Sequence, residues 1–422
     1  MSRVVFIGLL IYLLVFAGLA TLRGEFLAMA IPLLFYMAFG LIDRPAIMQL
    51  EIHREIVPKR VISGAPFQIH LTVTNRGQAL KEVILQDSVP TNLNVLEGSP
   101  SLLCELHTQE TVEVSYTCRA TRGLYLFPGV RLISSDRFGI FTRTESYSLK
   151  DRILVRPEVH RLKKVMIRPR ITRIYAGNIP TRQSGSGVDF YGVRSYQSGD
   201  PLRYLNWKSA ARHPGSLFTT EFEPERVAVI WLMLDARRRS DLQGVGGPLF
   251  EHLVSATAAL SHAFLNEGNR VGLLIYGGFL DWTYSGYGKM QRERIMQALA
   301  RARTGESLIF DKLEHLPTRI FPPRSQIVLL SPLHPEDVPI LIRWRSFGYD
   351  VICICPDPIA FEQDLLPQGE DQELGLRLAR LERKLLFSQL RQAGIRLTSW
   401  DVSIPIEQVI GGALNRASLR RV

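Results

Sequence analysis

The sequence is poor in the residues and motifs that mark disulfide-stabilised proteins and common hydrolases. Only four cysteines occur in 422 residues, at irregular spacing, so a disulfide scaffold is not indicated. The G-x-S-x-G sequence of a serine nucleophile and the H-E-x-x-H sequence of a zinc protease are both missing, and the nine histidines are scattered. No side chain therefore stands out as a nucleophile.

Two partial motifs are incomplete. The run 285–289, SGYGK, resembles part of a phosphate-binding loop, but Thr283 stands where its first glycine is required and Met290 where a hydroxyl is required. Cys353 and Cys355 point to one face of an apolar strand, with no histidine or second cysteine pair nearby. Core packing is therefore favoured over metal binding, and we expect no cofactor.

The formal net charge of +11 favours contact with something acidic, such as anionic lipid, an acidic partner or nucleic acid. A recognition element for nucleic acid is not evident, so specific nucleic-acid binding has no further support. Six of the 51 basic residues lie close together in a segment at 161–173, within a linker predicted over 158–186. This segment either lies on an anionic membrane surface or forms a solvated linker.

Two long apolar runs lie at the N-terminus, at 4–22 and 26–42, with only three residues between them. Each is long enough to cross a hydrocarbon core, and together they predict a transmembrane helical hairpin over residues 1–43. A signal peptide is the alternative for the first run, because Arg3 precedes it, but the second run makes cleavage less favourable. Basic residues at Arg3 and from Arg44 onward predict that both ends and the soluble bulk face the cytoplasm. We therefore expect a multi-pass protein of the cytoplasmic membrane.

Residues 45–157 show the pattern of an all-β module. Apolar side chains occupy every second position in 67–73 and again in 112–118. Several short strands at this spacing predict a β-sandwich of immunoglobulin-like shape. Cys104 and Cys118 would form a disulfide only if the module lay outside the cell, and are expected to be free in a reducing cytosol.

From residue 224 to residue 422, helix and strand patterns alternate. The run 227–234 is a near-continuous apolar strand of the kind that is buried on both faces of a parallel sheet. Further strands are predicted at 271–276, 326–330, 351–355 and 395–400, and helices at 248–266, 290–303, 335–347 and 374–393 and from 405. The alternation predicts a doubly wound α/β sheet.

The densest group of special residues lies in a block at 187–223. Asp200 is placed to cap a helix that begins at Pro201 and runs to about Arg212, where a His-Pro-Gly sequence ends it. The candidate interaction residues of this block are Asp189, Arg194, Tyr196, Gly199, Asp200, Arg203, Asn206, Trp207 and Arg212.

Two interpretations of the block remain open. In the structural one, Asp189 and Asp200 pair with the arginines, and Trp207 fills the gap between the sandwich and the α/β domain. In the functional one, the arginines and the helix N-terminus form a pocket for an anion or a carboxylate.

The start of the block reads G-x-D-F-x-G-V-R-x-Y-x-x-G-D-x-x-R-x-x-N-W-x-x-x-A-R, which resembles the signature of the family catalogued as domain of unknown function 58. The segment at 122–141, RGLYLFPGVRLISSDRFGIF, also looks like the corresponding region of that family. Many members are membrane-anchored bacterial or archaeal proteins without an assigned activity. The resemblance implies a MoxR-type AAA ATPase as partner and a von Willebrand factor A-like fold for the α/β domain.

In metal-binding domains of that fold, the first strand ends in D-x-S-x-S and a later strand in Thr or Ser followed by Asp. Here Asp235 is followed by Arg237 and Arg239 in place of both serines, and Ser331 is followed by Pro332. Two cationic side chains would repel a hard cation, so we expect no metal at this site. Arg237 or Arg239 is expected to form an ion pair with Asp235 instead.

These observations favour a membrane-anchored adaptor without catalysis of its own, which works with the ATPase in assembling or maturing other complexes. The alternative is an envelope-related hydrolase that uses Asp200 and Asp189 as acid and base.

Overall fold

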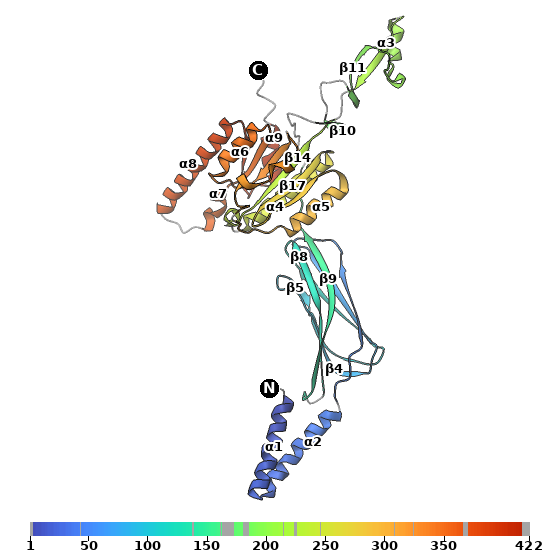
Figure 1. Ribbon diagram of the computed structural model, residues 1–422, viewed down its shortest axis with the longest axis vertical. Coiled ribbons are helices and arrows are strands. Elements are labelled where there is room, and N and C mark those ends of the chain that lie inside the picture. Colours follow the sequence, from blue (N-terminus) through green and yellow to red (C-terminus); the bar gives the residue numbers. More distant parts are fainter. Residues whose placement is uncertain are drawn as a thin grey trace. The chain divides into compact units, whose positions relative to one another are not determined.

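The computed structural model describes residues 3–42, 44–136, 139–160, 162, 173–179, 185–213, 215–222, 226–244, 246–307, 309–323, 325–365 and 370–415. The chain divides into two compact units, Met1–Arg156 and Pro157–Val422 (Figure 1). Within the basic segment at 161–173, only Leu162 and the backbone of Arg173 are described, so the predicted lipid contact lies outside the described residues. The same holds for the side chain of Asp189.

Two apolar helices begin the chain, α1 (Arg3–Thr21) and α2 (Gly24–Ile42). Each has 19 residues, which at about 1.5 Å per residue approaches the thickness of a hydrocarbon core. By length and composition both are suited to crossing a membrane. Gly18 lets them approach closely, because a Cβ there would lie only 2.9 Å from Cγ of Leu27.

The rest of the first unit consists of two β-sheets. The four-stranded sheet has the order β1-β3-β7-β5 and the five-stranded sheet the order β2-β9-β8-β4-β6. Their strands are β1 (Leu50–Val57), β2 (Val61–Ile62), β3 (Pro66–Asn75), β4 (Leu80–Asp87), β5 (Asn94–Gly98), β6 (Ser101–Leu106), β7 (Thr111–Arg119), β8 (Gly123–Ser135) and β9 (Thr142–Arg156). Alternate residues of both sheets point into one core, including Ile69 and Leu71 from β3 and Val83 and Leu85 from β4.

A buried ion pair joins the two sheets. Nη2 of Arg54, on β1, donates to Oδ1 of Asp87, on β4, at 2.5 Å, and neither side chain is exposed. The Tyr116 hydroxyl donates to Oδ2 of the same carboxylate at 2.7 Å. Cys104 and Cys118 are free thiols.

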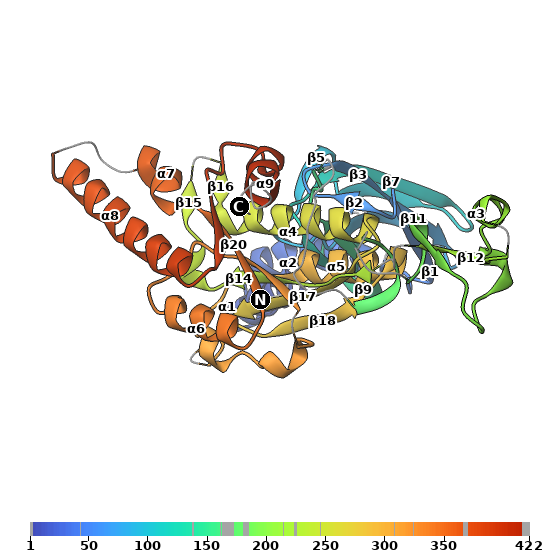
Figure 2. The same cartoon turned by 90° about the horizontal axis from the view of Figure 1, so that it is seen from above.

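The second unit contains a mixed sheet with helices on both faces (Figure 2). Among the described residues, six strands pair in the order β18-β17-β14-β19-β20-β21, and only β18 runs antiparallel to its neighbour. The strands are β14 (Val229–Ala236), β17 (Arg270–Gly277), β18 (Asp281–Gly286), β19 (Gln326–Leu330), β20 (Asp350–Pro356) and β21 (Arg396–Trp400). The five predicted strands are present among them, whereas β18 was not predicted.

The helices of this unit are α4 (Leu249–Asn266), α5 (Gly288–Arg301), α6 (Asp337–Ser346), α7 (Pro358–Glu362), α8 (Glu370–Gln392) and α9 (Ile406–Asn415). Alternate residues of β14 enter different cores: Ile230 and Leu232 pack with α4, α5 and α9, and Trp231 and Met233 with α6 and α8. The sheet is thus buried on both faces, which explains the continuous apolar runs of its strands.

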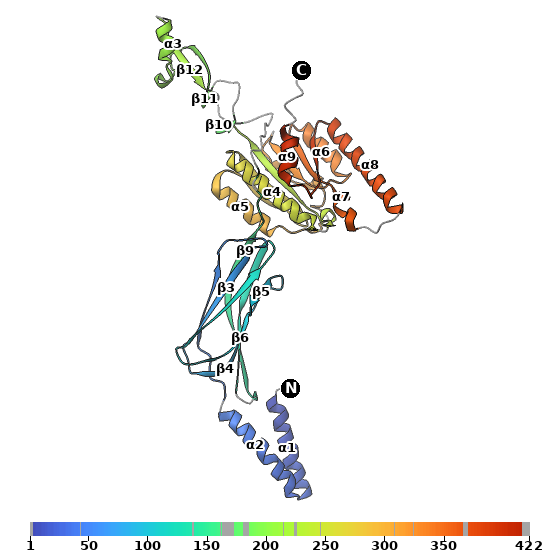
Figure 3. The same ribbon diagram turned by 180° about the vertical axis from the view of Figure 1, so that it is seen from behind.

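Smaller elements complete the unit. The short strands β15 (Gln243–Gly244) and β16 (Gly247–Pro248) pair with each other, and β10 (Arg173–Ile179) pairs with β13 (Arg226–Val227). β11 (Gly185–Ser195) and β12 (Phe218–Phe222) form a separate antiparallel ribbon, and α3 (Trp207–Arg212) lies beside it (Figure 3).

Candidate functional site

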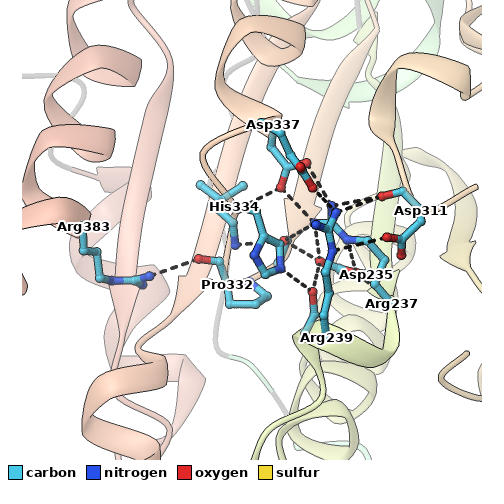
Figure 4. Close-up of polar contacts among 12 residues, drawn as sticks. Asp235, Arg237, Arg239, Asp311, Pro332, His334, Asp337 and Arg383 are labelled. Carbon is cyan, nitrogen blue, oxygen red and sulfur yellow. Dashed lines mark hydrogen bonds and ion pairs between the residues drawn. The ribbon is translucent and has the colours of Figure 1, made fainter. Parts of the chain in front are cut away.

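The candidate site lies at the carboxyl edge of the six-stranded sheet. β14, the first strand of this sheet in the chain, lies between β17 and β19, so the strand order reverses beside it. Asp235 is near the end of β14, Ser331 follows β19, and Asp337 begins α6. Open α/β sheets bind ligands at this position, where the connections leave the sheet in opposite directions. Figure 4 shows the polar side chains that meet here.

The centre of the site is filled by the guanidinium of Arg237, which is fully buried. Its Nε and Nη2 donate to the two oxygens of Asp235, at 3.0 and 2.8 Å. Its Nη1 and Nη2 donate to the two oxygens of Asp337, both at 2.9 Å. Two carboxylates, one near the end of β14 and one at the start of α6, therefore hold one guanidinium in paired hydrogen bonds, which is a strong and directional arrangement.

Further hydrogen-bond donors contact the oxygens of the two carboxylates. Oδ2 of Asp235 accepts from the hydroxyls of Ser331 and Ser240, at 2.6 and 2.8 Å. Oδ2 of Asp337 accepts from the backbone N–H of His334 at 2.9 Å. Because the Ser240 hydroxyl donates to Asp235, the contact of 3.0 Å between Ser240 Oγ and His334 Nε2 requires the histidine to be the donor. All four carboxylate oxygens thus accept hydrogen bonds from the chain.

The charges of this site hold one another in the ionised state. Burial by itself would raise the pKa of Asp235, but the Arg237 guanidinium and the neighbouring hydrogen bonds bring that pKa below its usual value. Burial would likewise lower the pKa of Arg237, yet Tyr276, Asp235 and Asp337 together raise it above its usual value. Asp235 and Arg237 are therefore both charged at neutral pH.

Of the two arginines considered as partners of Asp235, Arg237 is the one that pairs with it. Arg239 lies nearer the surface, with its Nε 3.4 Å from Oδ2 of Asp311, and it also pairs with Glu336. The site does not fit a divalent cation, because a guanidinium already occupies the space between the carboxylates and satisfies them. Its arrangement fits an arginine in the place of a metal ion.

The block at 187–223 contains a second ionic cluster, on the β11–β12 ribbon. Nη1 and Nη2 of Arg194 donate to the two oxygens of Asp200, both at 2.8 Å, and Nε donates to Oε1 of Glu221 at 2.7 Å. The backbone N–H of Gln197 donates to Asp200 at 2.9 Å, across a turn in which Gly199 has a φ of +109°. The hydrogen bonds from Arg194 and Gln197 lower the pKa of Asp200 to about 2.

The helix predicted from Pro201 to Arg212 is wrong in its first half. A 3-10 turn covers Leu202–Tyr204, and α3 begins only at Trp207. Asn206 caps α3, because its side chain accepts from the backbone N–H of Ser209 at 3.0 Å. The chain is extended between the two pieces, where Leu205 pairs with Thr219 of β12. Asp200 has been drawn into the ion pair with Arg194 instead of capping the helix.

Within its own unit, 69% of the surface of Trp207 is exposed, and its packing between the sandwich and the α/β domain stays a prediction. Leu202 is 70% exposed, and the guanidinium of Arg203 lies over the ring of Tyr204 at 4.7 Å from its centroid. Asp200 pairs with Arg194 rather than with Arg203 or Arg212. The Tyr196 hydroxyl donates to the backbone oxygen of Asp200 at 3.4 Å. We call the exposed set Leu202, Arg203, Trp207 and Lys208 the signature surface.

Several residues of both clusters are absent from the sequence-based candidates. Asp337, Ser240 and His334 belong to the Arg237 site, and Glu221 to the Arg194 cluster. Sequence reasoning could have found Asp337. An arginine directly after a buried strand needs acidic partners, and these must come from connections at the same edge of the sheet. Glu221 has no such signal, because its partner depends on how β11 and β12 are aligned.

The fold and site together define a chain with two apolar N-terminal helices, a β unit, and an α/β unit whose ligand position is filled by arginine. Residues 192–357 match the family described as protein of unknown function DUF58, which confirms the resemblance predicted from the block. The chain is 28% identical over 250 residues to the uncharacterized protein YeaD of Bacillus subtilis, covering 58% of this chain and 60% of that protein. It thus spans less than two thirds of that relative's length.

Likenesses to solved structures are much weaker. A FixG-related protein from Vibrio parahaemolyticus is matched at a TM-score of 0.18 and 12% identity, over 26% of this chain and 98% of that one. An alpha-2-macroglobulin from Escherichia coli is matched at a TM-score of 0.21 and 17% identity, over 27% and 24% of the respective chains. Scores this low support no conclusion about fold or function.

Proposed function

We propose that this chain is a membrane-anchored interaction protein without catalysis of its own. The observation that carries the proposal is the state of the sheet edge, where Arg237 is held by Asp235 and Asp337 and is fully buried. A sheet of this type would bind a ligand or a metal ion there. Because a guanidinium binds both carboxylates, the side chains at this sheet edge are suited to holding the fold rigid and not to catalysis.

The proposal includes a finer description of the two units. We assign the α/β unit a von Willebrand factor A-like fold, because its first strand lies inside the sheet, its edge strand β18 is antiparallel, and Asp235 lies near the end of β14, at the expected place. We assign the β unit an immunoglobulin-like sandwich, because two sheets share one core and Arg54 pairs with Asp87 across it. The sheets are antiparallel except for the short parallel pairing of β2 with β9.

For the membrane anchor, we propose that α1 and α2 form a hairpin with both ends in the cytoplasm. Arg3 is the first residue of α1, and Arg44, Arg54, Lys59 and Arg60 follow α2, while the charges of Arg23 and Glu25 cancel at the turn between the helices. Both soluble units would then face the cytoplasm from the inner membrane, and the basic segment at 161–173 would be available for contact with anionic lipid.

The signature surface is the proposed contact site for a partner. Trp207 and Leu202 place large apolar groups in solvent next to Arg203 and Lys208, and Trp and Arg are enriched among the residues that dominate binding energies. The ion pairs of Arg194 with Asp200 and Glu221 join the turn that precedes this surface to β12. The family resemblance implies a MoxR-type AAA ATPase as the partner, in the assembly or maturation of other complexes.

The alternative of an envelope-related hydrolase finds no support from Asp200. A general acid must hold its proton near neutral pH, and enzymes achieve this by raising a carboxyl pKa. Hydrogen bonds from Arg194 and Gln197 shift the pKa of Asp200 in the opposite direction, to about 2.

The proposal can be tested by detergent pull-down of the full chain from its own host, with and without ATP. Trp207→Ala and Arg203→Ala remove exposed groups and should leave the fold intact. Tyr284→Ala is the matched control, because Tyr284 is 66% exposed but lies on β18, outside the block. We expect an AAA ATPase to be captured by the wild type and by Tyr284→Ala, and to be lost from the two signature variants.

The absence of an ATPase from the wild-type sample in every nucleotide state would refute the partner. Equal capture by all variants would refute the signature surface as the contact site, while the ATPase would remain the proposed partner. Turnover of a substrate that Asp200→Asn abolishes would refute the non-enzymatic proposal as a whole.

A further inference from the structure

The outward face of α8 carries a second apolar stripe. Four of its leucines are between 56% and 69% exposed: Leu374, Leu378, Leu381 and Leu385. They follow one another at intervals of four, three and four residues, which is the spacing of the a and d positions of a coiled coil. We call these four residues the leucine seam.

The opposite face of α8 already supplies its attachment to the sheet. Phe387 and Leu390 are buried in the core that α8 shares with α6. Arg383 donates to the backbone oxygens of Pro332 and Pro356, at 3.0 and 2.7 Å. Figure 2 shows α8 at one end of the α/β unit, beside α7. The helix is therefore fixed in place by one face, and the leucine seam is not needed for that attachment.

A helix on the surface of a globular unit normally has one apolar stripe and a polar outer face. Single exposed leucines are common and need no explanation, but a row of four in one register is unusual. Since the described part of the α/β unit provides no cover for these four residues, the row fits a partner helix of the same periodicity.

The charges beside the leucine seam indicate which helix that is. With Leu378 and Leu385 at a positions, Arg377 and Lys384 occupy g positions and Glu382 an e position. In a parallel pair of two copies, each g residue faces the e residue of the following heptad, so Arg377 faces Glu382 of the second copy. In an antiparallel pair g faces g, and Arg377 would meet Lys384 with like charge. The pattern is thus self-complementary in the parallel orientation.

We propose that α8 pairs with the α8 of a second copy of this chain as a short parallel coiled coil. The bond of 2.5 Å between Arg377 and Glu373 on the same helix does not oppose this pairing, because both side chains are more than two-thirds exposed and can exchange partners. Two heptads bind weakly by themselves. The membrane anchor proposed above would hold two copies in the same orientation and raise their effective concentration.

The full chain in detergent provides the test, with its mass measured by light scattering over a range of concentrations. We expect a concentration-dependent dimer for the wild type. Leu378→Gln combined with Leu385→Gln should give a monomer, while Leu103→Gln, which changes a leucine that is 67% exposed on β6, should remain dimeric. A wild type that stays monomeric at every concentration overturns the proposal.

Charge variants test the orientation. Arg377→Glu and Glu382→Arg each create two like-charge contacts in the parallel dimer, so each should weaken self-association by about tenfold or more. Mixing the two single variants restores opposite charges in both contacts, so the mixture should form mixed dimers. If Arg377→Glu instead strengthens the dimer, the helices are antiparallel and the proposal is wrong.

Engineered cysteines give a second readout of orientation. Leu381→Cys places two d-position thiols opposite each other in the parallel dimer and should crosslink readily, whereas Arg380→Cys, one residue away and off the seam, should not. Equal crosslinking of both variants overturns the proposal. The crosslinking result does not depend on the proposed ATPase partner. A pull-down with the combined Leu378→Gln and Leu385→Gln variant shows separately whether dimerisation is needed to capture that partner.

Discussion

Replacement of Arg237 by leucine is the sharpest test of the buried site. The change removes four side-chain hydrogen bonds to Asp235 and Asp337, at 2.8 to 3.0 Å, and leaves both carboxylates in an environment without solvent. Leucine fills most of the aliphatic part of the space, so the lost packing is small beside the lost charge. The expected effect on the free energy of unfolding is therefore that of a buried charge left without its counter-ion.

The magnitude follows from this arrangement. Removing one partner of a buried ion pair destabilises a protein by about 3–5 kcal/mol, because the remaining charge has neither solvent nor a counter-ion. Here two carboxylates lose the same partner, so we expect a value near the upper end, about 5 kcal/mol. Changing Asp337→Asn in addition removes one of the orphaned charges and should restore part of the loss, which makes the two effects non-additive.

Urea unfolding followed by tryptophan fluorescence provides a specific assay. The five tryptophans of the sequence all lie in the second unit, and Trp231, Trp344 and Trp400 are at most 4% exposed there. The fluorescence of the full chain in detergent thus reports the α/β unit and not the β unit. The midpoint and slope of the transition give the free energy of unfolding.

Arg239→Leu is the matched control. Arg239 lies two residues away and pairs with Asp311 and Glu336, but its side chain is 36% exposed, so its loss should change stability by less than about 1 kcal/mol. A result in which Arg237→Leu is no more harmful than Arg239→Leu would refute the account of the site.

The pH dependence gives a second check of the same reasoning. In the wild type, the lowered pKa of Asp235 contributes stability above its unfolded-state pKa, and that contribution is lost as the pH falls toward the folded-state value. In Arg237→Leu, burial acts alone and raises the pKa of Asp235, so its destabilisation is largest at neutral pH and lessens as acid protonates the carboxyl group. The two unfolding curves should therefore converge on acidification.

Three further predictions follow from the described contacts. Arg237→Ser leaves two carboxylates with added hydroxyl ligands, so millimolar Mn²⁺ should raise its urea midpoint while leaving that of the wild type unchanged; an equal effect on both proteins would contradict this. Burial raises the pKa of all four cysteines, to about 12 for Cys118 and Cys355, but Cys104 is only partly buried while the other three are buried, so alkylation of the native chain followed by mass spectrometry should label Cys104 first. The carboxyl carbon of Asp200 should titrate in NMR near a pKa of about 2, and a midpoint close to the ordinary aspartate value would contradict its pairing.

The elements of the α/β unit could be predicted because their patterns are local. The strand predicted at 326–330 matches β19, and α4 differs by one residue at its start from the prediction of 248–266. β18 was missed because none of its six residues is buried: Trp282 and Tyr284 alternate with half-buried residues but are themselves exposed, so the strand lacks an apolar core face. Its assignment depends on its pairing with β17, which is a tertiary contact.

The block at 187–223 illustrates the opposite case. Asp200 followed by Pro201 has the local chemistry of a helix start, and the sequence alone favours a cap. The aspartate has a stronger alternative in the structure, because the turn after β11 brings Arg194 within 2.8 Å of it, and the alignment of β11 with β12 fixes the same guanidinium on Glu221. Local propensity was overridden by an ion pair that only the folded ribbon creates.

The sequence by itself determined the two apolar helices, the mixed α/β character of the second half, and the arginine substitutions after Asp235. These depend on composition and on periodicities within about twenty residues, which are local properties of the chain. The tertiary structure alone decided that Arg237 rather than Arg239 pairs with Asp235, and that Asp337, 100 residues further on, completes the site. The reason is physical: the partners of a buried charge are chosen by which strand ends meet at one sheet edge, and that depends on strand order rather than on neighbouring residues.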